Sequence, residues 1–154
     1  MIAVIQRVNQ AHISVNGKII SRIGQGLLVL VGVHKSDSDA DVEFLAKKIP
    51  AMRIFPDPAG KMNVSLLDIR GELLLVSQFT LCADVYSGRR PSFTESALPE
   101  LATKLLAQLV SIIRNQGITV QTGEFAAHME VGLVNDGPVT FVLDSRTARL
   151  HPTS

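Results

Sequence analysis

A polar segment at residues 133–140 contains a Gly-Pro pair and separates two apolar runs that have the character of β-strands. Residues 128–134 alternate between apolar and polar side chains, as in a half-buried strand, and residues 139–143 form the second run. Gly137 permits a positive φ, while Pro138 fixes its own φ, lacks a backbone donor and makes a cis peptide bond inexpensive. We therefore expect a rigid turn that joins two strands and holds two carbonyl groups in a fixed direction. An ordinary turn has the same composition, so this segment alone indicates no function.

The composition of the chain predicts one compact domain. Of its 154 residues, 46% are hydrophobic and 19% are charged, which supplies enough apolar material for a full core. The net charge of +1 argues against an extensive nucleic-acid footprint but leaves room for a small one. Cys82 is the only cysteine, which excludes an internal disulfide and a multi-thiolate metal site and favours a reducing compartment.

The N-terminal residues differ from a secretion signal. Their apolar start is interrupted at once by Gln6 and Arg7, and no apolar run approaches the roughly 20 residues of a membrane span. We therefore expect a cytoplasmic protein that does not associate with membranes.

Apolar segments in the N-terminal part of the chain predict antiparallel β-structure. Residues 2–8 and 12–15 have strand character, and an Asn-Gly pair at 16–17 followed by residues 18–23 predicts a tight hairpin. Residues 26–33 are continuously apolar, which is typical of a central strand that is covered on both faces.

Two helices are predicted from apolar spacing and charge. Acidic side chains at residues 36–41 precede a helical run that extends to Ile49 and carries lysines in its last turn. The longest helix is expected over residues 97–116, because leucine and isoleucine recur there at three- and four-residue spacing. Pro99 is tolerated in its first turn, and Gly117 is a typical stop.

The order of these elements predicts an α+β fold. Further strands are expected at residues 72–79 and 118–122, and strands and helices do not alternate strictly along the chain. We expect a largely antiparallel or mixed sheet with helices packed on one side. A single domain is expected over residues 1–145, followed by a polar, poorly ordered tail over residues 146–154.

No catalytic motif is evident in the sequence. The histidines are far apart and lack the spacing of metal ligands, so we expect neither a metal site nor a cofactor. They are His12, His34, His128 and His151. Thr80 has no neighbouring base that would make it a nucleophile. Cys82 leaves open a thiol hydrolase, although a lone cysteine after an apolar strand is more often a small core residue.

Arg89 and Arg90 are adjacent in a loop that spans residues 87–92. They either lie in solvent or contact phosphate groups, and charge alone favours the first interpretation.

Two motifs resemble those of the D-aminoacyl-tRNA deacylases, which include the D-tyrosyl-tRNA(Tyr) deacylases. Residues 77–81 read S-Q-F-T-L, and residues 135–140 read N-D-G-P-V-T and match the family pattern N-x-G-P-V-T. Supporting matches extend along the chain as far as Ser145, at residues 6–8, 26–33, 53–55, 60–63, 90–93 and 122–123. Ala126 departs from the family, which usually has glycine there, and its methyl group could crowd a close backbone approach or demand a negative φ.

The resemblance implies a carboxylic ester hydrolase with a barrel-like sheet. Its substrate would be the ester between a D-amino acid, or glycine mischarged on tRNA-Ala, and the terminal adenosine of tRNA. It would act as a homodimer with active sites at the subunit interface. In the family the Gly-Pro bond is cis, and the turn of one subunit enters the pocket of the other. Gly137 and Pro138 would then present their carbonyl groups to the substrate's α-carbon, excluding an L side chain but admitting glycine.

Roles for the remaining site residues are also implied by the resemblance. Backbone amides around Phe79 and Thr80 would stabilise the oxyanion that forms as water attacks, and Arg7 would brace the Gly-Pro turn. The substrate and its adenosine would lie along Ser77, Gln78, Phe79, Met129 and Asn135. The family is thought to rely on the 2′-hydroxyl of the tRNA rather than on a protein base, in agreement with the missing triad.

Besides the thiol hydrolase, two alternatives remain open at this point. One is a non-catalytic protein that binds the acceptor end of aminoacyl-tRNA, which the low aromatic content of 5% disfavours. The other is a relative with relaxed chirality that removes L-alanine and has a trans bond in the equivalent turn. Arg7 and the intact motif at residues 135–140 favour the cis, D-selective branch.

Overall fold

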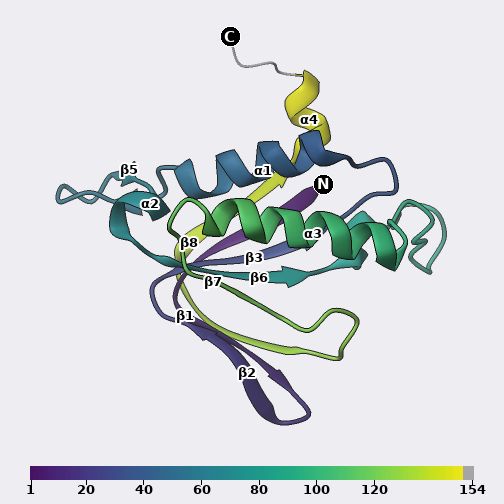
Figure 1. Cartoon of the computed structure of the whole chain (residues 1–154), viewed down its shortest axis with the longest axis horizontal. Helices are drawn as coiled ribbons and strands as arrows, with labels where there is room; N and C mark the ends of the chain where they lie inside the picture. The colour runs from purple at the N-terminus through teal and green to yellow at the C-terminus, as the bar shows by residue number, and fades with distance from the viewer. Residues whose placement is uncertain (151–154) are drawn as a thin grey trace.

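The structure, a computed structural model, describes residues 1–150 (Figure 1). Its strands are β1 (Ile2–Val15), β2 (Lys18–Ile23), β3 (Gly26–Gly32), β4 (Phe55–Pro56), β5 (Met62–Val64), β6 (Glu72–Ser77), β7 (Val120–Thr122) and β8 (Glu130–Asp144). Its helices are α1 (Asp39–Ala51), α2 (Leu66–Ile69), α3 (Pro99–Arg114) and α4 (Ser145–Leu150), with a short 3-10 helix, η1 (Phe79–Cys82).

A mixed sheet forms the centre of the molecule, in the order β2-β1-β3-β6-β7, and β8 also pairs with β1. The pairs that β1 makes are antiparallel, whereas β3–β6 and β6–β7 are parallel. Below the helices, β1, β2 and β8 curl away from them (Figure 1), and the Ser21 hydroxyl of β2 donates to the Thr122 carbonyl of β7. The sheet is therefore nearly closed and barrel-like, which confirms the predicted α+β class.

Both long helices cover one face of this sheet, as predicted (Figure 1). The larger core contains α1, α3 and the sheet residues beneath them, including Leu27 and Val29 of β3. Leu28 points to the opposite face, where a smaller core fills the curled part of the sheet together with Ile13 and Leu74. Strand β3 is thus buried on both faces, which explains its uninterrupted apolar sequence.

β1 is one long strand, whereas the sequence predicted two. Its first part, from Ile2 to Val8, pairs with β3, and its second part, from Ala11 onward, pairs with β2. β8 pairs with both parts of β1. The polar residues between them lie where β1 changes partners, and local sequence cannot distinguish such a change from the end of a strand.

Turn residues adopt the predicted conformations, and α1 begins with a capping box that was not predicted. Asn16 and Gly17 have φ values of 50° and 75°, as a tight hairpin turn requires. Ser38 and Asp41 form a capping box at the start of α1. Beyond α3, Gly117 has a φ of +86°, which favours glycine.

The prediction of a poorly ordered tail over residues 146–154 is wrong for residues 146–150, which belong to α4. Its first residue is tied to the core, because the Met1 ammonium donates to Ser145 Oγ at 2.6 Å and Ser145 Oγ donates to Asp41 Oδ1 at 2.7 Å. Residues 151–154 of the predicted tail, including His151, lie outside the described residues.

The segment around Gly137 and Pro138 is a bulge within β8, and the prediction of a turn that joins two strands is wrong. Thr140 pairs with Gln6 and Asn135 pairs with Val8, so both sides of the bulge follow the same strand, β1. Four residues, 136–139, therefore lie opposite Arg7 alone. The bulge projects backbone without reversing the direction of the chain.

Candidate active site

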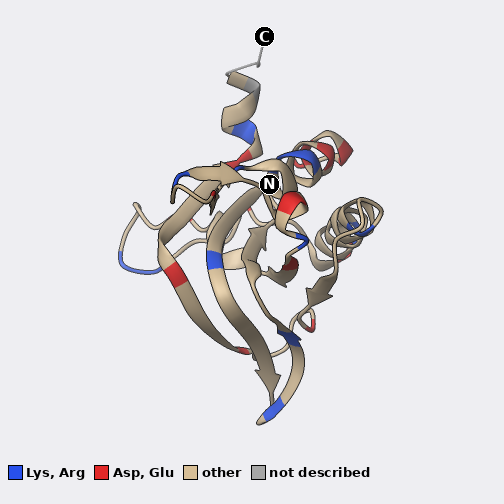
Figure 2. Cartoon of the chain, turned by 90° about the vertical axis from the view of Figure 1, so that its left-hand side faces the viewer, with Lys and Arg blue, Asp and Glu red and all other residues tan. Residues whose placement is uncertain are grey.

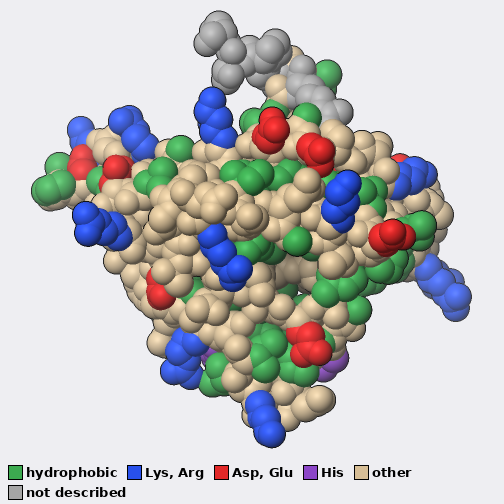
Figure 3. Space-filling view, viewed as in Figure 1, with side chains coloured by type: hydrophobic (Ala, Val, Ile, Leu, Met, Phe, Trp, Pro, Cys, Tyr) green, Lys and Arg blue, Asp and Glu red, His purple; other side chains and the backbone are tan. Residues whose placement is uncertain are grey.

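A cavity of about 530 Å³ opens between α3, the end of β6 and the segment that precedes β8. The surface is hollowed there, below α3 (Figure 3). Its walls are formed by Val31, Val33, Val76, Ser77, Gln78, Phe79, Ala97, Pro99, Ala102, Leu106, Phe125, Ala126, Ala127, His128, Met129 and Val131. Most of these side chains are apolar, and His128 is the titratable one. A concave, mainly apolar site with a few polar groups is the usual form of a small-ligand pocket.

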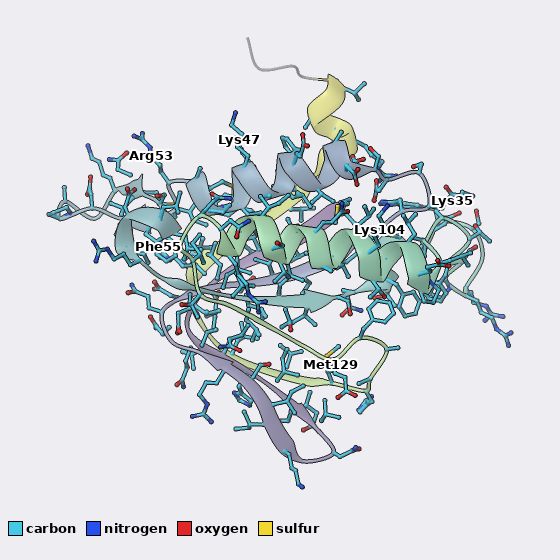
Figure 4. The ribbon with its side chains drawn as sticks, in the orientation of Figure 1. Lys35, Lys47, Arg53, Phe55, Lys104 and Met129 are labelled. Carbon is cyan, nitrogen blue, oxygen red and sulfur yellow. The ribbon has the colours of Figure 1, made fainter. Side chains whose placement is uncertain are left out.

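Four of the residues predicted for the site meet in this cavity. Ser77, Gln78 and Phe79 reach it at the point where β6 ends, because the chain there leaves the sheet for η1. Met129 comes from the segment before β8 and lies below α3 (Figure 4). The fold therefore brings together residues that are about fifty positions apart in the sequence.

The start of η1 adjoins the cavity through Phe79. Phe79 and Thr80 are the first residues of this helix, and the first amides of a helix have no acceptor within it. The Thr80 side chain is exposed and does not line the cavity, and its hydroxyl accepts a hydrogen bond from Gln78 Nε2. Thr80 is thus a chain neighbour of Phe79 and not itself a residue of the cavity wall.

Phe79 is held in place although its side chain is 58% exposed. Its ring packs edge-on against Phe93, with 5.1 Å between the ring centroids. Ser96 Oγ donates to the Phe79 carbonyl at 3.2 Å. These contacts fix the mouth of the cavity.

Ala126 lines the cavity and has a φ of +62°. The sequence left open whether this alanine would demand a negative φ, and it does not. Alanine in the left-handed region costs roughly 1–2 kcal/mol, because Cβ crowds the following carbonyl oxygen. Ala126 thus has a backbone conformation that suits glycine, although it carries a methyl group.

A second cavity of about 440 Å³ continues from the first and shares Ser77, Leu106 and Phe125 with it. Its remaining walls come from α3, β6 and β7 and include Thr103, Ser111, Arg114 and Asn115. Sequence reasoning missed these residues, because a polar helix face that lines a groove has the same spacing as one that faces bulk water. Phe125 lines both cavities, and no pattern in the sequence pointed to it as a site residue.

The other predicted site residues lie away from this cavity. Asn135, Gly137, Pro138 and Arg7 do not line it. Arg7 stacks near Phe55, 6.0 Å from the ring centroid, and Phe55 lies at a different end of the molecule from Met129 (Figure 4). Within one chain, the bulge and the cavity are therefore separate.

Arg7 braces the bulge from inside the protein. It is only 8% exposed, its Nη1 donates to the Ile54 carbonyl at 2.6 Å, and its Nε donates to the Asp136 carbonyl at 3.0 Å. The same Nε lies 3.0 Å from Asp136 Oδ2. Because the guanidinium holds its donors in a fixed plane, it couples the bulge rigidly to the segment at Ile54.

Gln6 ties the two sides of the bulge to each other. Its Nε2 donates to Asn135 Oδ1, and its Oε1 accepts from Thr140 Oγ1 at 2.8 Å. A Cβ on Gly137 would lie 2.1 Å from Asn135 Nδ2. A side chain here would displace the Asn135 amide, and Gly137 does not have the positive φ that the sequence suggested, while the Gly137–Pro138 peptide bond is cis.

Cys82 does not have the properties of a catalytic thiol. It is buried, and burial together with the nearby Asp37 carboxylate raises the pKa of the thiol to about 11. Nucleophilic cysteines instead have a lowered pKa and partial exposure. Within residues 1–150 no group of three or more His, Cys, Asp or Glu side chains is arranged to hold a metal ion. None of the helices in that range is long and apolar enough to span a membrane.

Comparison with known proteins identifies the family. The sequence model of the family described as D-Tyr-tRNA(Tyr) deacylase matches residues 4–144. A protein named D-aminoacyl-tRNA deacylase from Thermosipho africanus is 58% identical over 146 residues, covering 95% of this chain and 98% of the relative. One of the same name from Chloroflexus aurantiacus is 53% identical, covering 97% of this chain and 94% of the relative.

Solved structures share this fold. One titled c-Myc DNA Unwinding Element Binding Protein superimposes with a TM-score of 0.87 at 37% identity, covering 94% of this chain and 98% of the other. A probable eukaryotic D-amino acid tRNA deacylase superimposes with a TM-score of 0.80 over 92% of this chain and 97% of the other, and at 18% identity it supports the fold alone. The chain therefore belongs to the D-aminoacyl-tRNA deacylase family of enzymes.

Proposed function

We propose that this protein hydrolyses the ester bond of D-aminoacyl-tRNA, releasing free tRNA and the amino acid, as a quality-control step of translation. The observation that carries this proposal is the cavity where the segment from Ser77 to Phe79, at the junction of β6 and η1, meets Ala126 and Met129. The names of the close relatives support the choice of substrate. An aminoacyl-tRNA substrate would place the protein in the cytoplasm.

The reaction would depend on backbone groups. The ester carbonyl would lie against the amides of Phe79 and Thr80, which stabilise negative charge on its oxygen when water attacks the carbonyl carbon. The bond to the ribose oxygen then breaks, and a proton from the attacking water goes to that oxygen. The neighbouring 2′-hydroxyl of the tRNA would relay this proton in place of a protein base. His128 is the titratable side chain of the cavity wall, but among the described residues it forms no hydrogen bond to a nucleophile or a carboxylate.

A second copy of the chain would complete the site. β8 has β1 as its sheet partner, and its outer edge carries exposed apolar side chains. They are Leu133, Val134, Phe141 and Val142, which are 41%, 46%, 38% and 66% exposed. An open strand edge with apolar side chains favours pairing with another chain. In a two-fold dimer built on β8, the bulge of each subunit would enter the cavity of the other.

The bulge would then act as a stereochemical filter. The carbonyl groups of Gly137 and Pro138, positioned by the contact of Arg7 with the preceding Asp136, would occupy the space beside the substrate's α-carbon that an L side chain needs. A D side chain points away from them, and glycine has no side chain to exclude. We therefore propose that glycyl-tRNA, including glycine mischarged on tRNA-Ala, is also a substrate. Asn135 would steady the filter through Gln6.

The test is the deacylation rate of D-tyrosyl-tRNA, L-tyrosyl-tRNA and glycyl-tRNA at catalytic protein concentration, with and without a chelator. We expect rapid loss of the D and glycyl esters, an intact L ester and no effect of the chelator. Cleavage of all three at similar rates would contradict the filter and support a relative with relaxed chirality, with Ala126 the first residue to examine. Tight binding of aminoacyl-tRNA without turnover would replace the enzyme with a protein that binds the acceptor end.

A further inference from the structure

The loop at residues 84–92, between η1 and α3, carries basic and aromatic side chains that the proposed reaction does not use. Tyr86, the only tyrosine in the chain, is 95% exposed, and its neighbour Val85 is 60% exposed. Arg89 and Arg90 are also exposed. An exposed aromatic ring beside basic side chains is the combination that proteins use to bind single-stranded nucleic acid.

This loop has a defined conformation. Asp84 and Ser92 form a β-bridge, with hydrogen bonds of 2.8 Å and 2.9 Å in the two directions. Inside it, the Tyr86 amide donates to Asp84 Oδ1 at 2.9 Å, and Gly88 has a φ of +75°, which allows the chain to turn. Tyr86 and the two arginines therefore project from a closed loop, which lowers the entropy lost when they bind a ligand.

The base of the loop is part of the cavity mouth. Phe93 follows the loop directly, and its ring packs against Phe79, which lines the cavity. Ser96 then bonds to the Phe79 carbonyl. A polymer whose end occupies the cavity would thus leave it next to this loop.

The charge of the two arginines is not neutralised locally. Within residues 1–150, neither Arg89 nor Arg90 forms an ion pair. Of the nearby acids, Glu95 is paired with Lys35 at 2.8 Å and Asp84 accepts from a backbone amide. Figure 2 shows the remaining charged residues dispersed over strands, helices and loops, so two adjacent arginines on one loop are a local concentration of positive charge.

We propose that this loop binds the single-stranded RNA that precedes the esterified adenosine, with Arg89 and Arg90 on its phosphate groups and the Tyr86 ring stacked on a base. This inference rests on the proposed function, since the ester in the cavity fixes where the RNA emerges. Arginine is suited to phosphate, and an exposed aromatic ring is suited to an unpaired base. Because the loop would contact phosphate groups and the flat face of a base, it would bind tRNAs of different sequence.

The test compares the double variant Arg89→Ala/Arg90→Ala with a control of equal charge, Lys18→Ala/Lys47→Ala. Lys18 is the first residue of β2 and Lys47 lies on α1 (Figure 4), and both are exposed. Each protein is assayed on D-tyrosyl-tRNA and on D-tyrosyl-adenosine. We expect the arginine variant to lose about tenfold in kcat/KM on the tRNA and to change less than about twofold on the adenosine ester, with the control unaffected on both.

Two further readouts distinguish RNA contact from a general structural effect. The slope of log kcat/KM against log salt concentration on the tRNA should become shallower by about 1.4, which is roughly 0.7 for each phosphate group that an arginine no longer neutralises. Tyr86→Ala should lose about fivefold on the tRNA, whereas Tyr86→Phe retains the ring and should keep the wild-type value.

Several results would overturn the inference. Equal losses on the tRNA and on the adenosine ester, or the same loss in the lysine control, would show that the loop does not contact RNA. If sedimentation shows that the arginine variant forms a weaker dimer, the loop contacts the second subunit and not RNA. If the wild type hydrolyses both substrates and the arginine variant equals it on both, the loop inference alone fails; if the wild type hydrolyses neither, the proposed function fails with it.

Discussion

Arg7 Nε donates to the carbonyl of Asp136 at 3.0 Å and lies 3.0 Å from the carboxylate of the same residue. One side chain thus fixes both the backbone and the side chain of the residue that precedes Gly137. Because its Nη1 also holds the Ile54 carbonyl, the position of the bulge depends on a segment more than eighty residues earlier in the chain. Arg7 itself is buried, so these contacts lie inside the protein and not on its surface.

Replacing Arg7 should therefore loosen the bulge. Arg7→Ala leaves two carbonyl groups and a partly buried carboxylate without their donor, which should destabilise the protein by about 2–3 kcal/mol in urea unfolding. The ratio of kcat/KM for D-tyrosyl-tRNA to that for L-tyrosyl-tRNA should fall at least tenfold. Arg7→Lys keeps the charge but cannot hold both carbonyl groups, so it should lose most of this selectivity. Unchanged selectivity in both variants would contradict the bracing role.

Ala126 offers a test of backbone strain at the cavity wall. Ala126→Gly removes Cβ from a residue with a φ of +62°, and the relief should exceed the extra entropy of glycine in the unfolded chain. We expect the free energy of unfolding to rise by about 0.5–1 kcal/mol. Ala127→Gly is the matched control: this neighbour has no positive φ, so the change should lower stability by about 0.5–1 kcal/mol. The same sign for both variants would argue against strain at Ala126.

The sequence predicted local structure correctly where residues close together in the chain determine the conformation. The Asn16–Gly17 hairpin and the end of α3 at Gly117 depend on the φ that each residue favours. Long strands did not follow in this way. The extent of β1 is set by its three partner strands, and the bulge in β8 keeps its direction because β1 lies along both of its sides. These relationships are between distant segments, so turn residues at 133–140 could not reveal them.

The candidate site was predictable only in part, for a related reason. Ser77, Gln78, Phe79 and Met129 lie together, yet it was family motifs and not their spacing that selected the first three. The contribution of α3 depends on which part of its polar face covers the cavities, a property of packing and not of periodicity. α4 was missed because its anchor is a hydrogen bond from the first residue of the chain to Ser145.

His34 should make stability sensitive to mild acid. Burial lowers the pKa of this imidazole below its ordinary value of 6.5, and Arg146 and the Met1 ammonium act in the same direction against Asp37 and Asp144. The unfolded chain therefore binds the proton more readily, so this contribution to stability is complete above pH 6.5 and is lost as the pH falls below it. Urea unfolding at pH 7.5 and pH 5.5 should show the decrease, and His34→Gln should reduce the difference between the two. A pH dependence that His34→Gln leaves intact would assign the effect to other groups.

Cys82 should be dispensable for activity. With burial raising its pKa to about 11, the thiol is almost entirely protonated at pH 8, so iodoacetamide should react with it far more slowly in the folded protein than in urea. Cys82→Ala should hydrolyse D-tyrosyl-tRNA within about threefold of the wild-type rate, since truncation of a buried side chain affects packing and not the reaction. Loss of all activity in a variant that still unfolds cooperatively would revive the thiol hydrolase.

A substitution of Thr80 would distinguish a mechanism that uses backbone amides from one that uses the threonine side chain. The hydroxyl of Thr80 is bonded to Gln78 Nε2, whereas its amide lies at the start of η1, next along the chain to the cavity residue Phe79. Thr80→Ala removes the hydroxyl and keeps the amide, so kcat on D-tyrosyl-tRNA should stay within about threefold of wild type, far from the 10²–10³-fold loss that follows removal of an oxyanion donor. Gln78→Ala is the companion variant, because it breaks the same hydrogen bond from the other side. If Thr80→Ala abolishes turnover while circular dichroism and urea unfolding remain unchanged, the hydroxyl takes part in the reaction and the proposal of a site built from backbone amides is wrong.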